Sequence, residues 1–85
     1  MIIINKLFVG NLSFGVVNED LGKLFSDFGE VEEAVVIIDR DTRRSKGFGF
    51  VTFKQSADAL KAKEGLNGKD FQGRNLTIDE ARPKV

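Results

Sequence analysis

The chain of 85 residues contains no cysteine, no histidine, no tryptophan and no tyrosine. Without cysteine it can form neither a disulfide bond nor a thiolate nucleophile, and without histidine it lacks the imidazole base and the usual zinc-binding sets. The scattered Asp and Glu residues form no paired-carboxylate or nucleophile–base pattern. We therefore expect a protein that is not an enzyme and that needs no metal and no cofactor.

The chain also lacks a net charge, with 13 Lys and Arg residues against 13 Asp and Glu residues. Nucleic-acid-binding proteins usually carry a basic excess, so this balance by itself does not favour such a function. The charges are nevertheless unevenly distributed. Acidic residues are concentrated at 19–33 and basic residues at 40–46, with two more basic residues at 82 and 84. The chain is neutral but polarised.

The length suits one domain, which we place at residues 5–82, followed by a short basic tail at 83–85. The apolar start, MIII, is too short for a signal peptide or a membrane span, so we interpret it as an extension of the first strand. We expect an intracellular protein without a membrane partner. Its location would be cytoplasmic, or the nucleus or an organelle if the source is eukaryotic.

The first helix has the clearest pattern. Residues 18–29 place apolar side chains at i, i+3, i+4 and i+7, which makes one continuous stripe; these are Leu21, Leu24, Phe25 and Phe28. Asn18 is a suitable N-cap, and Gly29 is a suitable stop. A second helix at about residues 56–65 has a weaker pattern, with Ala59, Leu60, Ala62 and Leu66 as its apolar residues.

Strands are predicted at residues 6–12, 31–38, 46–53 and 75–79, and a turn-rich segment around Asn67-Gly68 precedes the last one. Together with the helices, the order is β-α-β-β-α-β. This order predicts an α+β, ferredoxin-like fold, in which two helices cover one face of a four-stranded antiparallel sheet. The other face can remain open to solvent. The two strands rich in Phe should form the central pair.

The segment KGFGFVTF (Lys46–Phe53) raises the question of which phenylalanines are buried. Side chains in a strand alternate between two faces. Burying Phe48 and Phe50 would also bury Lys46, which is costly, whereas burying Val51 and Phe53 would bury no charge. Gly47 and Gly49 on the buried side are expected to let the helices approach closely.

The first strand obeys the same rule, with Leu7 and Val9 on the buried face and Lys6 on the open face. An exposed aromatic trio is therefore expected on the open face of the sheet: Phe8, Phe48 and Phe50. Such a cluster, flanked by lysines, suits unstacked nucleobases, because each ring can stack on a base while each lysine meets a phosphate. The basic loop at 40–46 could then close over the strand.

These residues resemble a known family. KGFGFVTF matches the eight-residue signature of the RNA recognition motif at every position. LFVGNL (residues 7–12) is similar to the companion six-residue motif, and DRDTRRSKGFGFV, LNGKDFQGRNL and DEARP are also similar to the family, so the resemblance spans nearly the whole chain. The chain looks most like short single-domain members of bacterial or plant glycine-rich type. The resemblance implies non-catalytic binding of short single-stranded RNA.

The resemblance also implies individual roles. Phe8 and Phe50 would stack on bases, and Phe48 would pack against sugars. Lys46 would pair with a phosphate, and the end of the last strand would contact bases through main-chain and side-chain groups. The full set of RNA-binding candidates comprises Lys6, Phe8, Arg40, Arg43, Arg44, Lys46, Phe48, Phe50, Thr52, Asp79, Ala81 and Arg82.

Five positions depart from the family pattern. Val35 and Ile37 should lie on the open face, where polar or basic residues are common, so they would extend the apolar patch. Asp79 places a negative charge on the RNA side. Lys63 stands at an aliphatic core position, from which its stem can carry the ammonium group outward. Arg43 occupies a position where glycine is common, so the loop turn should differ.

Alternatives remain open. The same face could bind a peptide, which would make the protein a protein–protein adaptor; the neutral charge favours this interpretation, as do Val35, Ile37 and Asp79. For the basic loop, a solvated surface loop is an equal alternative. We expect single-stranded RNA as the main partner of a monomer, with single-stranded DNA or a protein partner left open.

Overall fold

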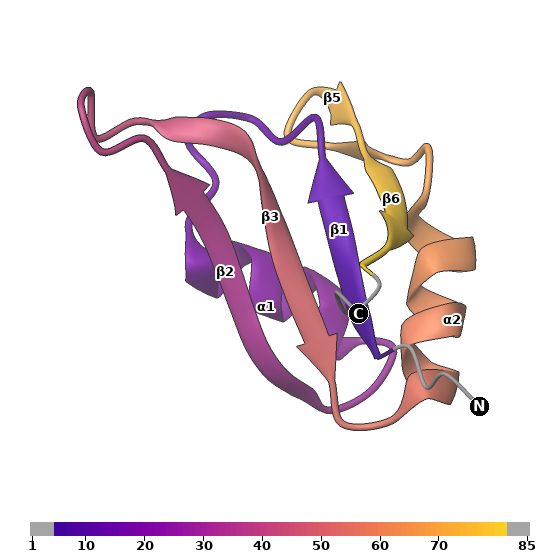
Figure 1. The fold of residues 1–85 in the computed structure, drawn as a ribbon. Helices are drawn as coiled ribbons and strands as arrows, with labels where there is room; N and C mark the ends of the chain where they lie inside the picture. Colours follow the sequence, from indigo (N-terminus) through magenta and orange to yellow (C-terminus); the bar gives the residue numbers. More distant parts are fainter. Residues whose placement is uncertain (1–4, 82–85) are drawn as a thin grey trace.

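The computed structural model describes residues 5–81, in which two helices cover one face of a four-stranded sheet (Figure 1). The main elements are β1 (Lys6–Gly10), α1 (Asn18–Ser26), β2 (Val31–Ile38), β3 (Ser45–Phe53), α2 (Ser56–Leu66) and β6 (Thr77–Glu80). Two short strands between α2 and β6, β4 (Asp70–Phe71) and β5 (Arg74–Asn75), pair as a separate hairpin. The predicted ferredoxin-like arrangement is confirmed.

The order of the strands in the sheet is β2-β3-β1-β6, and every neighbouring pair is antiparallel. The central pair therefore consists of β1 and β3, as predicted. In their register Leu7 lies opposite Val51, and Phe8 lies opposite Phe50. Residues that are directly opposite share a face of the sheet. This register separates the buried apolar residues of both strands from the aromatic residues.

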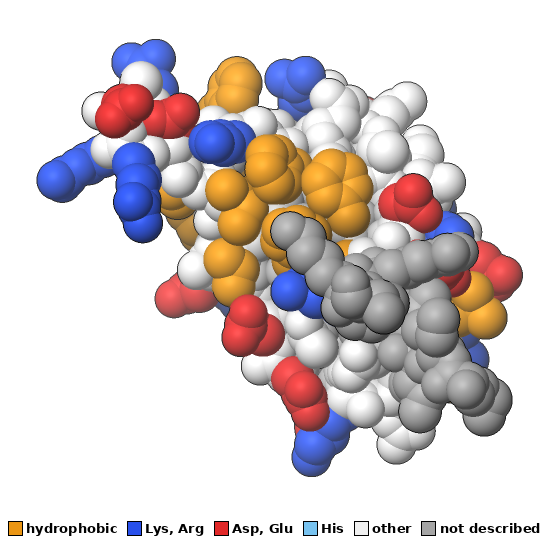
Figure 2. Space-filling view, in the orientation of Figure 1, with side chains coloured by type: hydrophobic (Ala, Val, Ile, Leu, Met, Phe, Trp, Pro, Cys, Tyr) orange, Lys and Arg blue, Asp and Glu red, His pale blue; other side chains and the backbone are white. Residues whose placement is uncertain are grey.

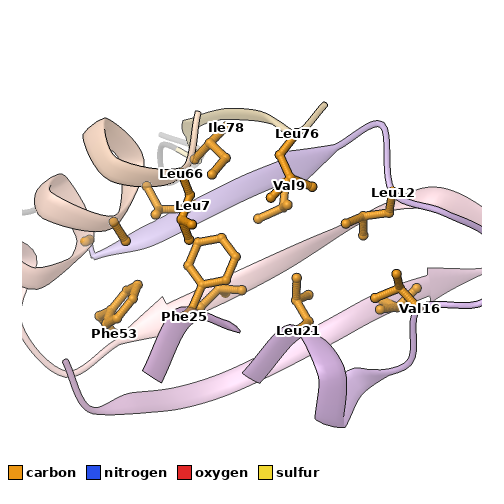
Figure 3. Close-up of a cluster of buried hydrophobic side chains, with 14 residues drawn as sticks. Leu7, Val9, Leu12, Val16, Leu21, Phe25, Phe53, Leu66, Leu76 and Ile78 are labelled. Carbon is orange, nitrogen blue, oxygen red and sulfur yellow. The ribbon is translucent and has the colours of Figure 1, made fainter. Parts of the chain in front are cut away.

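The hydrophobic core lies between the sheet and the helices (Figure 3). Its largest fully buried side chains are Phe25, Phe53, Leu7, Leu12, Leu21, Leu76, Val9 and Val51, and no polar or charged residue is buried among residues 5–81. The rings of Phe25 and Phe53 lie 6.1 Å apart. This confirms which face of β1 and β3 is buried. Leu60 of α2 is exposed, so it contributes nothing to this core.

The ends of α1 differ from the prediction. Asn18 is not the N-cap, because Val17 takes that position in an extended conformation. The Asn18 Oδ1 atom instead accepts a hydrogen bond of 2.7 Å from the Val36 N–H, which ties the start of α1 to β2. The helix ends at Ser26 rather than at Gly29. A Cβ at Gly29 would collide with the side chain of Asp58, so the close approach of α2 explains this glycine.

The expectation that helices approach closely at Gly47 and Gly49 is wrong. A Cβ on Gly49 would collide with the backbone oxygen of Val35 and would lie 3.1 Å from the Val36 Cα, both in the neighbouring strand β2. Gly47 has a φ of +81°, which favours glycine, and its carbonyl accepts a 2.8 Å hydrogen bond from the Leu12 N–H. Gly49 therefore allows the close pairing of β3 with β2, and Gly47 allows the backbone conformation at the contact with Leu12.

We predict that Gly49→Ala destabilises the protein by about 1–3 kcal/mol, because the added methyl group meets rigid backbone rather than a movable side chain. The free energy of unfolding from urea titration measures this effect. Gly15→Ala is the matched control, since a Cβ there would meet nothing within 4 Å. Equal stability of Gly49→Ala and the parent protein would contradict the prediction.

Candidate nucleic-acid interface

The open face of the sheet carries the aromatic trio of Phe8, Phe48 and Phe50. Their ring centroids are 5.6 Å apart for Phe8–Phe48, 5.9 Å for Phe8–Phe50 and 6.3 Å for Phe48–Phe50. The rings meet in tilted or edge-on geometries, which are favourable for aromatic pairs. Each ring remains partly exposed. Figure 2 shows the resulting apolar patch in the middle of this face, with basic side chains nearby.

Two lysines and a threonine accompany the trio. The Lys6 Nζ atom lies 5.0 Å from the centroid of the Phe50 ring, within range of a cation–π interaction. Thr52 lies opposite Lys6 in the register of the sheet and is half-buried. Lys46 is exposed, and with Phe8 and Phe48 it lines a hollow of about 290 Å³. The structure thus brings these predicted site residues of β1 and β3 together on one face.

The neighbouring strand β2 extends the apolar patch. Val35 lies opposite Phe50, which places it on the open face as predicted. Ile37 is half-buried like Val35, whereas Val36 between them is buried in the core. This alternation also places Ile37 on the open side, although a shift in register between Val36 and Ile38 interrupts the pairing there. The apolar patch of the open face therefore continues from the aromatic trio onto β2, where its side chains are aliphatic.

The loop between β2 and β3 is an ordered turn that projects beyond the sheet (Figure 1). The Asp39 carbonyl accepts a 2.8 Å hydrogen bond from the Arg43 N–H, and the Asp39 Oδ1 atom accepts bonds of 2.8 and 3.2 Å from the N–H groups of Asp41 and Thr42. These backbone bonds stabilise the carboxylate, so they lower the pKa of Asp39 below its usual value; the charge of Lys46 acts in the same direction.

The arginines of this loop lie apart from the trio. Arg40, Arg43 and Arg44 are all exposed. Arg43 and Arg44 line a groove of about 690 Å³, together with apolar side chains that include Phe14 and Ile38, and none of the trio lines this groove. Closure of the loop over a bound strand stays a prediction.

The end of β6 contributes an acid and a backbone contact. Asp79 lies opposite Phe8, with its side chain exposed; its Oδ1 atom accepts a 2.8 Å bond from the Glu80 N–H and lies 3.9 Å from the Lys63 Nζ atom. The Ala81 N–H donates to the Lys6 carbonyl at 2.9 Å, so this donor is already hydrogen-bonded to β1. Arg82, the tail and the MIII segment lie outside the described residues.

Lys63 behaves as predicted, because its stem carries the ammonium group out of the core. Its Nζ atom reaches β6, at 3.9 Å from a carboxylate oxygen of Asp79 and 4.0 Å from one of Glu80.

Sequence reasoning missed three residues at the end of the sheet, namely Asn11, Phe14 and Arg74. Phe14 is 68% exposed, and the Arg74 guanidinium carbon lies 6.0 Å from its ring centroid. The Arg74 Nε and Nη2 atoms donate to the Asn11 Oδ1 atom at 3.2 and 2.9 Å. One signal was present: Phe14 falls outside both the predicted strand and the helical stripe. The hairpin that carries Arg74 has strands of two residues, which are too short to show a period.

Fold and face together define a class of protein: a split βαβ domain whose open sheet face displays an aromatic trio flanked by lysines. The sequence model of the RNA recognition motif matches residues 7–77, and the chain belongs to this family. Within residues 5–81, no helix is both long enough and apolar enough to cross a membrane. The same residues contain no group of acidic side chains that could hold a metal ion.

Relatives carry names that refer to RNA. The chain is 51% identical over 80 residues to the 29 kDa chloroplastic ribonucleoprotein of Arabidopsis thaliana. The aligned region covers 94% of this chain and 23% of that protein. It is 44% identical over 79 residues to a glycine-rich RNA-binding protein of Daucus carota, and this alignment covers 93% of this chain and 50% of that protein. The chain thus spans half or less of the length of these two relatives.

Solved structures share the fold. The crystal structure of RNA binding protein PG1 has a TM-score of 0.87 at 47% identity, covering 93% of this chain and 98% of that one. The Sxl-lethal protein in a complex with RNA has a TM-score of 0.89 at 28% identity, covering 96% of this chain and 49% of that one.

The turn at Arg43 offers a test of local strain. Arg43 has a φ of +59°, a left-handed conformation that costs an L-residue about 1–2 kcal/mol and glycine little. Relief of this strain stabilises the folded Arg43→Gly variant, whereas the greater freedom of glycine in the unfolded chain offsets part of the gain. We therefore predict that Arg43→Gly leaves the free energy of unfolding unchanged or raises it by up to about 1 kcal/mol. Arg44→Gly removes the same charge from the next residue and should destabilise slightly. Urea titration that shows equal losses for both variants would contradict this prediction.

Proposed function

We propose that this domain binds short single-stranded RNA across its open sheet face, without catalysis and without a metal or cofactor. The observation that carries the proposal is the partly exposed aromatic trio on the face opposite the helices. An exposed aromatic cluster of this kind indicates a binding site. Single-stranded RNA is recognised mainly by stacking of unpaired bases on aromatic side chains. Membership of the family and the names of the relatives support the same function.

Two bases would stack on Phe8 and Phe50, and the sugars between them would pack against Phe48. A base on Phe50 would take the place of the Lys6 ammonium group, which now lies 5.0 Å from the ring centroid. The flexible stem of lysine lets this group turn to a phosphate. Lys46, exposed at the start of β3, would contact a second phosphate.

Asp79 would contribute to the choice of base. It lies opposite Phe8, and the bond from the Glu80 N–H occupies its Oδ1 atom. The other carboxylate oxygen can accept a hydrogen bond from the amino group of a base stacked on Phe8. The negative carboxylate of Asp79 repels the phosphates of the RNA. At this point of the site it therefore favours contact with the edge of a base over contact with the RNA backbone.

We predict that Phe50→Ala weakens RNA binding by about 1–3 kcal/mol, the usual contribution of one base–aromatic stack. Fluorescence anisotropy of a labelled degenerate RNA octamer measures the dissociation constant. Urea titration shows whether the variant remains folded. Leu60→Ala is the control, because Leu60 is exposed on α2 and should not touch RNA. Equal affinity of Phe50→Ala and the parent would contradict the stacking role.

The salt dependence should be shallow. If Lys6, Lys46 and one arginine each neutralise a phosphate, the log–log slope of affinity against salt should be about −2, at roughly −0.7 per phosphate of a single strand. The same anisotropy titration, repeated from low to physiological salt, gives the slope. A slope near −6 would mean that many phosphates are neutralised, against this prediction.

A peptide on the same face is the competing function, favoured by the aliphatic surface of Val35 and Ile37 beside Phe50. A folded parent that binds no RNA at low salt would support this adaptor function and overturn the RNA proposal. A degenerate DNA octamer of the same length, in the same assay, decides whether single-stranded DNA is also a ligand.

A further inference from the structure

The groove of about 690 Å³ beside Arg43 and Arg44 gathers most of the exposed apolar side chains of the molecule. Four large hydrophobic residues are exposed among residues 5–81, and three of them meet at this groove: Phe14 at 68%, Val17 at 55% and Ile38 at 51%. Exposed apolar residues that are scattered singly are ordinary, whereas a contiguous group of them marks an interaction site. We call this site the loop groove, because its lining comes from the β1–α1 loop, the β2–β3 loop and the strand ends beside them.

The loop groove lies apart from the open face of the sheet. A smaller hollow of about 360 Å³ shares Val17 and Ile38 with it and also reaches the buried Val36. Because Val36 belongs to the core between the sheet and the helices, this hollow opens on the helix side of β2. Figure 1 shows the β1–α1 loop passing behind the ends of β2 and β3. None of the aromatic trio lines either space, so a ligand here could bind while RNA occupies the sheet.

The charges of the two connected spaces have opposite signs at opposite ends. Arg43 and Arg44 are exposed beside the loop groove, and neither guanidinium group forms an ion pair with a carboxylate of residues 5–81. Among the described residues, the lining of the loop groove includes no acid. The smaller hollow, at the start of α1, adds Glu19 instead. A ligand complementary to both therefore carries negative charge at one end only.

The lining suits peptide side chains better than nucleotides. Val17 and Ile38 are aliphatic, and only Phe14 offers a flat ring on which a base could stack. An RNA strand would also bring a negative phosphate with every nucleotide, including those toward Glu19. A peptide can combine apolar side chains with carboxylates at one end, and arginine binds a carboxylate through two parallel hydrogen bonds. The groove volume lies within the range of ligand sites, about 300–1,000 Å³.

We propose that the loop groove binds a short peptide segment of a partner protein. Apolar residues of the peptide would lie among Phe14, Val17 and Ile38, and acidic residues would pair with Arg43 and Arg44. This surface is not the open face, so the inference goes beyond RNA binding and does not depend on it. A domain with both sites would hold an RNA strand and a protein partner at the same time.

Amide chemical shifts of the isotope-labelled full chain test where a peptide binds. The probes are two pools of capped peptides: one has two Asp or Glu residues beside three residues drawn from Leu, Ile, Val and Phe, and the other has Lys or Arg in place of the acids. We expect the acidic pool to shift the signals of Val17, Ile38 and Arg44 and to leave those of Phe8 and Phe50 unchanged. Titration of these shifts should give about tenfold tighter binding of the acidic pool than of the basic pool.

Two pairs of variants test the apolar and the charged part of the groove. Ile38→Ser and Leu60→Ser each remove a large apolar side chain that is 51% exposed, but only Ile38 lines the groove. Ile38→Ser should weaken binding of the acidic pool about fivefold or more, as loss of an anchoring side chain does, and Leu60→Ser should not. Arg44→Glu should cancel the preference for the acidic pool. Arg40→Glu makes the same change in the same exposed loop, outside the groove, and should keep that preference.

Urea titration shows whether each variant remains folded. If Ile38→Ser unfolds, Phe14→Ser takes its place, because Phe14 is 68% exposed in a loop and also lines the groove.

The outcomes distinguish this inference from the proposed function. Absence of shifts from the acidic pool, equal binding of both pools, or equal losses for Ile38→Ser and Leu60→Ser would overturn the peptide site. An RNA octamer that shifts the signals of Val17 and Ile38, while neither pool does, would assign the groove to RNA. A dimer in sedimentation that Ile38→Ser abolishes would make a second copy of the chain the occupant, against the proposal. If the acidic pool binds in the groove while the folded parent binds no RNA, the inference stands and the proposed function fails.

Discussion

The core of this domain accepts no charge, and the rest of the structure depends on that constraint. Every buried residue among 5–81 is apolar. Because Lys6 and Lys46 alternate with apolar residues in the two central strands, the lysine-bearing side of each strand must face outward. Phe8, Phe48 and Phe50 lie on that side and are carried to the open face with the lysines. The cost of burying an ammonium group thus positions the aromatic trio.

The pairing of the strands converts this outward face into a site. Phe8 and Phe50 lie opposite each other in the register of β1 and β3, and a slip of one residue would turn either ring toward the helices. Gly49 holds the other side of β3 tightly against β2, where no side chain fits. The rings of the trio are therefore carried by paired strands rather than by a loop.

A neutral domain that binds RNA would rely on stacking more than on charge. Lys6 and Lys46 stand beside the rings, whereas Arg43 and Arg44 line a groove that none of the three rings lines. This arrangement favours short, unpaired RNA over a duplex, whose bases are already stacked on one another.

Strand alternation and the cost of burying lysine are local properties, so the amino-acid sequence was enough to predict the fold class, the order of the main elements and the open face of the sheet. The contacts between distant segments came to light only in the folded chain. Arg74 and Asn11 are 63 residues apart, and Asn18 bonds to Val36 instead of capping its own helix. The reason for Gly49 likewise lies in the backbone of another strand. Such contacts depend on how the strands and loops are placed in space, and no periodicity within a single segment records that placement.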